Sequence, residues 1–593
     1  MAQEVTVGVG GAAGDGIDKT GDTFARAYAR LGLHMYAYNS YQSVIRGGHI
    51  WLRIRAAEEK VYSPGDQLNA MIALNQDTID QHAAEVNEHG VIIYNGDKLH
   101  VDESVFKPGV RAVPIPIKDL MKTVADRYGV RLDTVMQNTV LLGALIWLLQ
   151  LDLETLNKMY EEIFARKGQA VISQNVDLAL AGYEYAKANH PAMDYRWTYS
   201  RKSRPVLTGN ETIGIGALMA GCRFYSAYPM TPASSLLHFM ASHAAEYGVC
   251  VKQAEDELAV VNMAIGAGHV GVRAMCGTSG GGYALMTEAI GMAGMAEVPV
   301  VILEVQRGGP STGLPTKTEQ GDLNQVFGAS QGEYPRMIVA PADLVDTYNT
   351  TVEAFQMAEK YQLPVTIISD LLLSEHNETA DPEAFDFNVT IDRGELAEPN
   401  ENGNGEYKRY LVTESGISPR SLPGDAGNMF VGASDEHDER SILISDVYTD
   451  PLMRIKMMQK RMRKLEGLLR NLPAPTLHGP ADADITFISW GSTQGVIWDA
   501  IALLAQEGIK TNNLQIKYLV PFHTDEVATI LNSCKLKVLV EQNFTGQLGR
   551  HIRAETGISP DATILKYDGE PMEPLYIVNH VKEILNGTSR NGR

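Results

Sequence analysis

The sequence predicts an α/β protein built from three parallel-sheet domains. The first observation behind this prediction is length. The chain has 593 residues, which is enough for three or four domains of roughly 100–200 residues each. The second observation is pattern: in three separate stretches, short apolar runs alternate with helix-compatible segments, as expected for a parallel sheet that helices cover on both faces.

Composition and charge narrow the possible functions. With 44% hydrophobic and 21% charged residues, the chain can build several cores, which excludes a disordered, collagen-like or coiled-coil protein. Fifty-one Lys and Arg residues against 72 Asp and Glu residues give a net charge of −21. This charge repels phosphate backbones and disfavours nucleic acid or an anionic membrane as the main partner. Any anionic ligand must therefore be captured locally.

Cysteine usage and hydropathy indicate the compartment. The four cysteines have no spacing typical of a metal or cluster site, which predicts no metal and no iron–sulfur centre in this chain: Cys222, Cys250, Cys276 and Cys534. Their scarcity favours a reducing compartment. The start shows no signal-peptide pattern, and the longest apolar stretch, 140–149, is about half the length of a bilayer span. We expect a cytoplasmic protein without a membrane partner.

The first predicted domain covers residues 1–190. A strand at 5–9 runs into a glycine-rich turn and then a helix, the order that opens a β-α-β unit. Further strands are expected at 70–74 and 90–94, and a buried helix near 140–149. An extended linker follows.

The second predicted domain covers residues 200–380 and the last covers 480–593. Each alternates strands with helices. The expected strands of the second are 223–227, 272–277, 298–305, 337–340 and 363–369, and those of the last are 484–489, 511–518, 538–541 and 562–566.

Residues 381–475 between these domains are expected to form a linker and a helical arm. The first part is rich in Asn, Gly, Pro and acidic residues, which is typical of a long connection. A basic amphipathic helix near 451–471 follows. Such a helix either binds a membrane or a calmodulin-like partner, or forms a solvated arm that packs through its stripe of Met and Leu residues. We favour the arm.

The glycine turn can hold a phosphate at a helix N-terminus. A dinucleotide site is one alternative, but the strand at 34–38 ends in Asn39, where an acidic residue is expected. Asp15 and Asn39 also imitate a diphosphate–magnesium motif. Close helix–strand packing through small residues is the structural alternative. We favour a different phosphate-bearing ligand, with Arg46 in the next glycine-flanked loop as a further anion contact.

Glu257 stands at the start of a predicted apolar helix. A glutamate there is often only favoured by the helix dipole. However, a Glu followed by Leu and, nine positions on, by Gly266 resembles the activating glutamate region of thiamine diphosphate enzymes.

Four further blocks extend this resemblance. They occur in the order found in 2-oxoacid:ferredoxin oxidoreductase alpha subunits: YPMTPAS at 228–234, EDEL at 255–258, TSGGG at 278–282 and QRGGPSTGLPTKTEQGDL at 306–323. The glycine turn and SYQSVIRGGH at 40–49 look like the family's gamma domain. SWGST at 489–493 and EQNFTGQL at 541–548 look like its transketolase-C-type domain. The resemblance thus implies a Rossmann-like gamma domain, a pyrimidine-type thiamine diphosphate domain and a transketolase-C-type domain.

The resemblance also implies residue roles. Glu257 would activate the cofactor, Thr231 would hydrogen-bond the oxoacid, and Arg307 would bind its carboxylate. Lys317 would neutralise a second carboxylate, the alternative being a solvated loop lysine. For Thr231 the alternative is a turn hydroxyl that caps the next helix. The expected cofactor contacts are Tyr228, Pro229, Glu257, Ser279 and Gly280 for thiamine diphosphate, with Gly10, Gly11, Gly14 and Arg46 as candidate phosphate contacts for coenzyme A.

The family further implies partners. Thiamine diphosphate would be shared with a beta subunit that carries Mg²⁺ and a [4Fe–4S] cluster, with coenzyme A as co-substrate, ferredoxin as electron acceptor and a (gamma-alpha/beta)₂ assembly. The expected substrate is 2-oxoglutarate, converted to succinyl-CoA in a reversible reaction of the kind that a reductive TCA cycle uses; pyruvate and branched-chain oxoacids are the alternatives. An NAD-dependent dehydrogenase or a non-catalytic nucleotide-binding scaffold is the alternative class.

Overall fold

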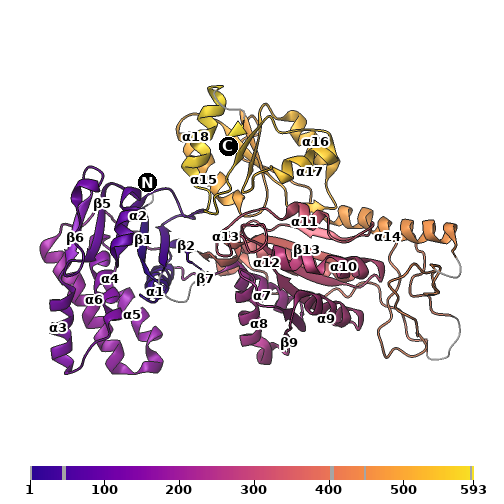
Figure 1. Cartoon of the computed structure of the whole chain (residues 1–593), viewed down its shortest axis with the longest axis horizontal. Helices are drawn as coiled ribbons and strands as arrows, with labels where there is room; N and C mark the ends of the chain where they lie inside the picture. The colour runs from indigo at the N-terminus through magenta and orange to yellow at the C-terminus, as the bar shows by residue number, and fades with distance from the viewer. Residues whose placement is uncertain (1–2, 43–47, 401–405, 446–448, 588–590, 593) are drawn as a thin grey trace. The chain divides into compact units, whose positions relative to one another are not determined.

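The structure, a computed structural model, describes residues 3–42, 48–400, 406–445, 449–587 and 591–592. It divides into two compact units (Figure 1). The first unit contains Met1–Leu207 together with His376–Ala384 and Glu573–Leu575. The second contains Thr208–Glu375, Phe385–Met572 and Tyr576–Arg593. Three sheets with helices around them confirm the predicted α/β class.

The first unit is built on an eight-stranded sheet in the order β6-β5-β4-β1-β3-β2-β14-β7. Strands β4, β5 and β6 run parallel to β1, whereas β3 pairs with β1 in antiparallel register from Glu4↔Ala57 to Ala12↔His49. The strands are β1 (Glu4–Ala12), β2 (His34–Ser40), β3 (His49–Ala57), β4 (Leu68–Ala73), β5 (Val86–Asn95), β6 (Arg111–Ile115), β7 (Val206–Leu207) and β14 (Asn377–Thr379).

Helices pack on this sheet around α4, which is buried along nearly its whole length, as expected for residues 140–149. The α-helices of the unit are α1 (Ile17–Arg30), α2 (Gln76–His82), α3 (Ile117–Tyr128), α4 (Gln137–Leu148), α5 (Leu153–Ile163) and α6 (Gln169–Asn189). Because β3 lies between β1 and β2, the strand that follows α1 is not the neighbour of β1. Strands β1, β4, β5 and β6 form the parallel part expected of the predicted Rossmann-like domain, and the antiparallel β3 between β1 and β2 is an addition to it.

The second unit holds a central seven-stranded sheet, β18-β12-β13-β11-β10-β8-β9, in which only the β12–β18 pair is antiparallel. Alternate residues of a strand point to opposite faces. Cys276 and Ile302 therefore pack in one core with α9 and α10, while Met275 and Leu303 pack in another with α7, α8 and α12. Figure 1 shows these helices around the sheet. The strands are β8 (Phe224–Ala227), β9 (Cys250–Gln253), β10 (Ala274–Thr278), β11 (Val300–Gln306), β12 (Met337–Val339), β13 (Pro364–Asp370) and β18 (Tyr518–Val520).

The helices of this region begin close to the carboxyl ends of the strands. They are α7 (Gly209–Met219), α8 (Ser234–Tyr247), α9 (Glu257–His269), α10 (Gly280–Met295), α11 (Leu323–Phe327), α12 (Leu344–Tyr361) and α13 (Leu371–Glu375). Because α9 and α10 both start there, their first turns lie at one end of the sheet, where open α/β sheets bind ligands.

A third sheet, β15-β17-β16-β19-β20-β21, lies in the carboxyl-terminal part of the second unit. Its elements are β15 (Leu477–His478), β16 (Ile485–Ser489), α15 (Thr493–Gln506), β17 (Thr511–Gln515), α16 (Thr524–Ser533), β19 (Lys537–Glu541), α17 (Gln547–Thr556), β20 (Ala562–Leu565), α18 (Pro574–Leu585) and β21 (Asn591–Gly592). The single strand expected at 511–518 is two strands: β17 joins this sheet, whereas β18 joins the central sheet.

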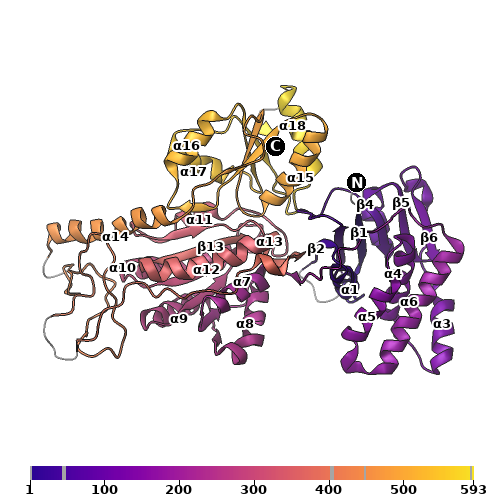
Figure 2. The same ribbon diagram turned by 180° about the vertical axis from the view of Figure 1, so that it is seen from behind.

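An irregular segment before α14 (Pro451–Asn471) occupies the expected linker region, and Figure 2 shows it beside that helix. Helix α14 ends where predicted, and Met457 and Leu468 are buried as the packed-arm interpretation requires. The expectation that its basic residues are solvated is wrong for Lys460, Arg461 and Lys464, which are buried as well.

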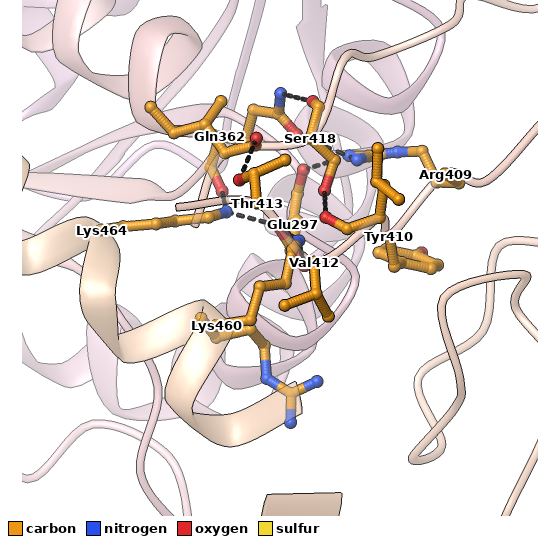
Figure 3. Close-up of polar contacts among 12 residues, drawn as sticks. Glu297, Gln362, Arg409, Tyr410, Val412, Thr413, Ser418, Lys460 and Lys464 are labelled. Atoms are coloured by element: carbon orange, nitrogen blue, oxygen red, sulfur yellow. Dashed lines mark hydrogen bonds and ion pairs between the residues drawn. The ribbon is translucent and has the colours of Figure 1, made fainter. Parts of the chain in front are cut away.

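Glu297 is the centre of this buried charge cluster (Figure 3). Its carboxylate accepts hydrogen bonds from Lys460 Nζ at 2.5 and 2.7 Å and from Lys464 Nζ at 2.5 Å. Arg409 of the irregular segment donates to the Glu297 carbonyl oxygen at 2.8 Å. Burial lowers the pKa of Lys460 to about 7, whereas the two ammonium groups and Arg409 hold the pKa of Glu297 far below its usual range despite burial. The cluster fastens both the irregular segment and α14 to the core of the unit.

Among the residues that the structure describes, no helix combines the length and the hydropathy needed to cross a bilayer.

Candidate active site

Glu257 occupies the first turn of α9, where Asp256 caps the helix by accepting a hydrogen bond from the Ala259 N–H at 2.8 Å. The Glu257 side chain is 3% exposed, and its Oε1 has no hydrogen-bond partner among the described residues. A buried carboxylate oxygen without a partner costs stability. Such an atom is therefore a strong indication of a ligand at this point.

The first turn of α10 faces this carboxylate. A Cβ atom on Gly282 would lie 2.5 Å from Glu257 Oε1 and 2.0 Å from Thr278 Oγ1, so only glycine allows this approach. Ser279, the N-cap of α10, is fully buried, and its Oγ also lacks a partner in the described part of the chain. Two unpartnered polar atoms thus accompany a helix N-terminus, which favours a bound polar or anionic group.

Asp322, which the sequence did not single out, lies against this turn and interacts with two further acidic side chains, Glu304 and Glu319. Asp322 Oδ2 would lie 2.2 Å from a Cβ on Gly280. Burial, together with the nearby Asp322 and Asp370 carboxylates, raises the pKa of Glu304 well above its usual value. Burial and Asp322 raise the pKa of Glu319 to about 7. A charged residue within the apolar strand β11 is the sequence signal by which Glu304 could have been found.

Thr231 and Arg307 lie together, as the substrate roles require. Arg307 Nη1 donates to the Thr231 carbonyl oxygen at 2.7 Å. The preceding residue, Met230, accepts a weak hydrogen bond from Thr278 Oγ1 at 4.0 Å through its sulfur. This contact links the 228–234 turn to the wall of the Glu257 site. Helix α8 has Ala233 as its N-cap and no side-chain cap, so Thr231 does not cap it.

Tyr228 and Pro229 are exposed at the start of that turn, and Tyr228 is 40% exposed. Leu258 is also exposed, at 47%, although its helix is apolar. Large apolar side chains therefore remain accessible in the elements that carry Glu257.

Lys317 contacts the carboxyl-terminal part of the chain. Its ammonium group forms an ion pair with Glu570, and the Thr318 N–H donates to the Gly569 carbonyl oxygen at 3.2 Å. Gln320 continues this attachment by donating to the Trp490 carbonyl oxygen at 3.0 Å. The motifs at 489–493 and 541–548 thus support the loop that follows Arg307.

The glycine turn of the first unit divides into two parts. Gly10 and Gly11 lie in β1, where a Cβ on Gly10 would meet Thr78 at 2.5 Å and Trp51 at 2.9 Å. The alternative of close packing through small residues accounts for them. Gly14 is exposed with φ 101° and lines a cavity of about 700 Å³ at the start of α1.

The expected anion contact of Arg46 and the imitation of a magnesium motif by Asp15 and Asn39 also concern the first unit. Arg46 lies outside the described residues. Asn39 donates to Asp18 at 2.7 Å, and Asp15 accepts from the Ala12 N–H at 2.9 Å, so both imitators of a magnesium motif have partners within the chain. In the described ranges no group of three His, Cys, Asp or Glu side chains is placed to hold a metal.

Three family models match the chain. The model described as pyruvate ferredoxin/flavodoxin oxidoreductase matches residues 6–185. The model of the thiamine diphosphate-binding part of pyruvate flavodoxin/ferredoxin oxidoreductase matches 215–442. The model of pyruvate:ferredoxin oxidoreductase core domain II matches 483–575. The central match contains all of Glu257, Thr231 and Arg307.

Whole-chain relatives agree with these matches. The chain is 32% identical to the 2-oxoacid:ferredoxin oxidoreductase subunit alpha of Saccharolobus solfataricus, with 98% of each chain covered. It is 27% identical to the 2-oxoglutarate oxidoreductase subunit KorA of Mycobacterium tuberculosis, with 93% of this chain and 87% of the relative covered.

A solved structure covers 98% of this chain and 99% of its own at 35% identity and a TM-score of 0.90. It is a 2-oxoglutarate:ferredoxin oxidoreductase from Magnetococcus marinus with 2-oxoglutarate, coenzyme A and succinyl-CoA bound. These relatives are 2-oxoacid or 2-oxoglutarate oxidoreductases. The alternative assignment of this chain as a non-catalytic scaffold or an NAD-dependent dehydrogenase is therefore wrong. The chain belongs to the family of 2-oxoacid:ferredoxin oxidoreductase alpha subunits.

Proposed function

We propose that this chain is the alpha subunit of a 2-oxoglutarate:ferredoxin oxidoreductase. In the proposed reaction a 2-oxoacid loses CO₂, its acyl group passes to coenzyme A, and two electrons pass to ferredoxin. The observation that carries the proposal is the buried, unpartnered Oε1 of Glu257 beside Gly282. The names of the Mycobacterium and Magnetococcus relatives support the choice of substrate.

The residues of this site fit the aminopyrimidine part of thiamine diphosphate. Glu257 Oε1 and Ser279 Oγ offer two unpartnered polar atoms, and Gly280 and Gly282 leave space beside them. Bound there, the cofactor would supply the carbon nucleophile and electron sink that 2-oxoacid decarboxylation needs. Glu257 Oε1 would hydrogen-bond a ring nitrogen of the cofactor and share a proton with it, while Tyr228 and Pro229 would form the outer wall.

Arg307 and Thr231 would orient the oxoacid. A guanidinium has five N–H donors in a planar fork, which suits a carboxylate. The bond from Nη1 to the Thr231 carbonyl oxygen holds the plane of this fork and leaves its other donors for the substrate. Arg307 thus binds the 1-carboxylate, and Thr231 hydrogen-bonds the oxoacid.

Lys317 would meet the second carboxylate of 2-oxoglutarate. Its present partner is the half-exposed Glu570 carboxylate, which is the kind of group that a substrate carboxylate can replace. Pyruvate has one carboxylate and makes no use of this lysine. The proposal therefore ties substrate choice to the Lys317–Glu570 pair.

A beta subunit would complete the site. Exposed Tyr228 and Leu258 offer apolar surface next to Glu257 for such a partner. Magnesium, the diphosphate contacts and the [4Fe–4S] cluster would come from that subunit, and two such pairs would form a (gamma-alpha/beta)₂ assembly that reduces ferredoxin. Coenzyme A would place its phosphates at the Gly14 end of the glycine turn, beside Lys19 and Lys167, which line the same cavity.

The proposed role of Glu257 is tested by Glu257→Gln in the enzyme reconstituted with its beta subunit. We expect kcat to fall by on the order of 10²–10⁴-fold, because the amide keeps the size of the side chain but cannot exchange the proton. The matched control is Glu255→Gln, two residues away and exposed. Unchanged folding with near-normal turnover in Glu257→Gln would refute the role.

Substrate choice is tested by Lys317→Ala. We expect kcat/KM for 2-oxoglutarate to fall at least 10-fold while that for pyruvate changes little, because only the first substrate has a second carboxylate. Glu570→Gln removes the competing partner and is expected to keep or improve 2-oxoglutarate turnover. An equal loss for both substrates in Lys317→Ala would show that the lysine only supports the loop.

A further inference from the structure

A second cavity, of about 330 Å³, lies in the second unit where the third sheet meets the central sheet. Its walls come from α15, β17, the start of α16, residues 473–476 and the first turn of α12. The connection between β17 and β18, Ile516 and Lys517, also lines it. None of the residues assigned above to thiamine diphosphate, oxoacid or coenzyme A is among its lining residues, so the proposed reaction gives it no role.

His523 faces this cavity with both ring nitrogens unused. It is 5% exposed, and neither nitrogen has a hydrogen-bond partner in the part of the chain that the structure describes. Nδ1 lies 3.7 Å from Glu526 Oε2, which is longer than a hydrogen bond. A neutral imidazole offers one donor and one acceptor, and burying both without partners is unfavourable.

Asn513 supplies a second unused atom. It is 1% exposed, and its amide nitrogen donates to the Phe487 carbonyl oxygen at 3.2 Å and to Ser489 Oγ at 2.8 Å. These two bonds fix the orientation of the amide, yet Oδ1 has no partner within the described ranges. The cavity therefore presents an acceptor from Asn513 together with a donor and an acceptor from His523.

Aromatic side chains form much of the remaining wall. His478, which pairs with Asn513 across the β15–β17 ladder, stacks on Trp498 with ring centroids 4.0 Å apart and planes at 18°. Tyr518 and Phe522 complete this wall. Such surroundings favour a planar ring.

The charges at the cavity disfavour an anionic ligand. Asp343 and Asp346 line it, and the one lysine among its lining residues, Lys517, is already paired with Asp346 Oδ1 at 2.6 Å. A phosphate group would therefore meet net negative charge. The ligand that fits is an uncharged heteroaromatic molecule with N–H groups and ring acceptors.

We propose that this cavity is a binding site for an uncharged nucleoside, with its base hydrogen-bonded by Asn513 and His523. The base offers the N–H donor that Asn513 Oδ1 lacks and the donor–acceptor edge that the imidazole lacks. The site is distinct from the coenzyme A site proposed above, because coenzyme A carries several phosphates.

The test is isothermal titration of the full chain with adenosine, guanosine, cytidine and uridine, and with the 5′-monophosphate of each as its charged counterpart. We expect at least one nucleoside to bind in a 1:1 ratio and its 5′-monophosphate to bind at least 10-fold more weakly. His523→Phe is expected to weaken nucleoside binding at least 10-fold and to keep the melting temperature, because it removes two unpaired polar atoms at similar size.

Two further variants make the result specific. Thr476→Trp places a bulky ring at an exposed position of the cavity rim and is expected to abolish binding without disturbing the core. His100→Phe, at an exposed position of the first unit, is expected to change nothing. The proposal is overturned if no nucleoside binds, which would mean that water alone fills the cavity. It is also overturned if binding survives both His523→Phe and Thr476→Trp, or if the 5′-monophosphate binds as tightly as its nucleoside.

Discussion

At the scale of single residues, the candidate site combines buried polar atoms that lack hydrogen-bond partners with glycines, which have no side chain, beside them. Glu257 and Ser279 bury polar atoms that have no partner in the described chain, and Glu304 is buried among other carboxylates. Burial without compensation lowers stability. Such features are retained where a bound group supplies the missing interactions.

Gly282 is the residue that allows α10 to approach Glu257. We expect Gly282→Ala to reduce kcat/KM at least 10-fold, because its Cβ would lie 2.0 Å from Thr278 Oγ1 and 2.5 Å from Glu257 Oε1 and must displace one of them. The neighbouring Gly281→Ala is the matched control, since its Cβ would meet no atom within 4 Å. Steady-state kinetics and thermal unfolding of both variants check this prediction. Equal activity of the two variants would contradict it.

Sequence motifs selected individual residues of the candidate site but did not predict their contacts. The blocks at 228–234 and 306–323 led to Thr231 and Arg307, which the structure brings together. The partner of Lys317 could not be foreseen, because Glu570 is 253 positions away and belongs to no block that was selected. Long-range ion pairs leave no periodic pattern in a sequence, whereas helix starts and glycine turns do.

At the scale of elements, α14 shows where pattern reasoning reached its limit. Its basic amphipathic pattern predicted its bounds, and the structure shows Asp450 as its N-cap with Pro451 in the first turn. Its buried face did not follow from hydropathy, because Lys460 and Lys464 are normally surface residues. They are buried since Glu297 offers a matching carboxylate in the core.

This cluster leads to a stability prediction. Glu297→Ala leaves two buried ammonium groups, those of Lys460 and Lys464, without their carboxylate, whereas Arg409 keeps its bond to the backbone carbonyl oxygen. Removing one partner of a buried ion pair costs about 3–5 kcal/mol. We expect a clear fall in the unfolding midpoint of the second unit, measured by thermal or urea denaturation. Glu507→Ala, which removes an exposed pair with Lys582, is expected to cost at most about 1 kcal/mol. A Glu297 variant as stable as this control would show that the cluster does not hold the arm.

Strands buried on both faces were the easiest elements to predict. Apolar runs located β10, β11 and β13 within two residues. The run at 511–518 was assigned to one strand because hydropathy does not reveal the change of sheet between Gln515 and Tyr518. Strand β3 was not predicted, and its antiparallel insertion beside β1 is what separates the first sheet from a purely parallel one.

At the scale of the whole molecule, motifs that are far apart in the sequence hold one loop of the candidate site in place. The loop after Arg307 is held by Trp490 and Gln542 from the carboxyl-terminal part, through hydrogen bonds of 3.0 and 2.7 Å with Gln320. The order of motifs along the chain predicted the family, and the whole-chain relatives confirmed it. The fold alone would not have indicated a function, because α/β sheets host many unrelated activities.

The last prediction concerns the need for a partner. The four cysteines are dispersed, and burial raises the pKa of Cys222 and of Cys276 to about 12, so neither is a ready thiolate ligand. We therefore expect the chain purified alone to lack iron–sulfur absorption in the visible range and to reduce neither ferredoxin nor a viologen. Addition of the beta subunit should restore both the absorption and 2-oxoacid-dependent reduction. Glu257→Gln serves as the control, since with the beta subunit it should regain the absorption but not the activity. Turnover by the chain alone would contradict the assignment of the cluster to a separate subunit.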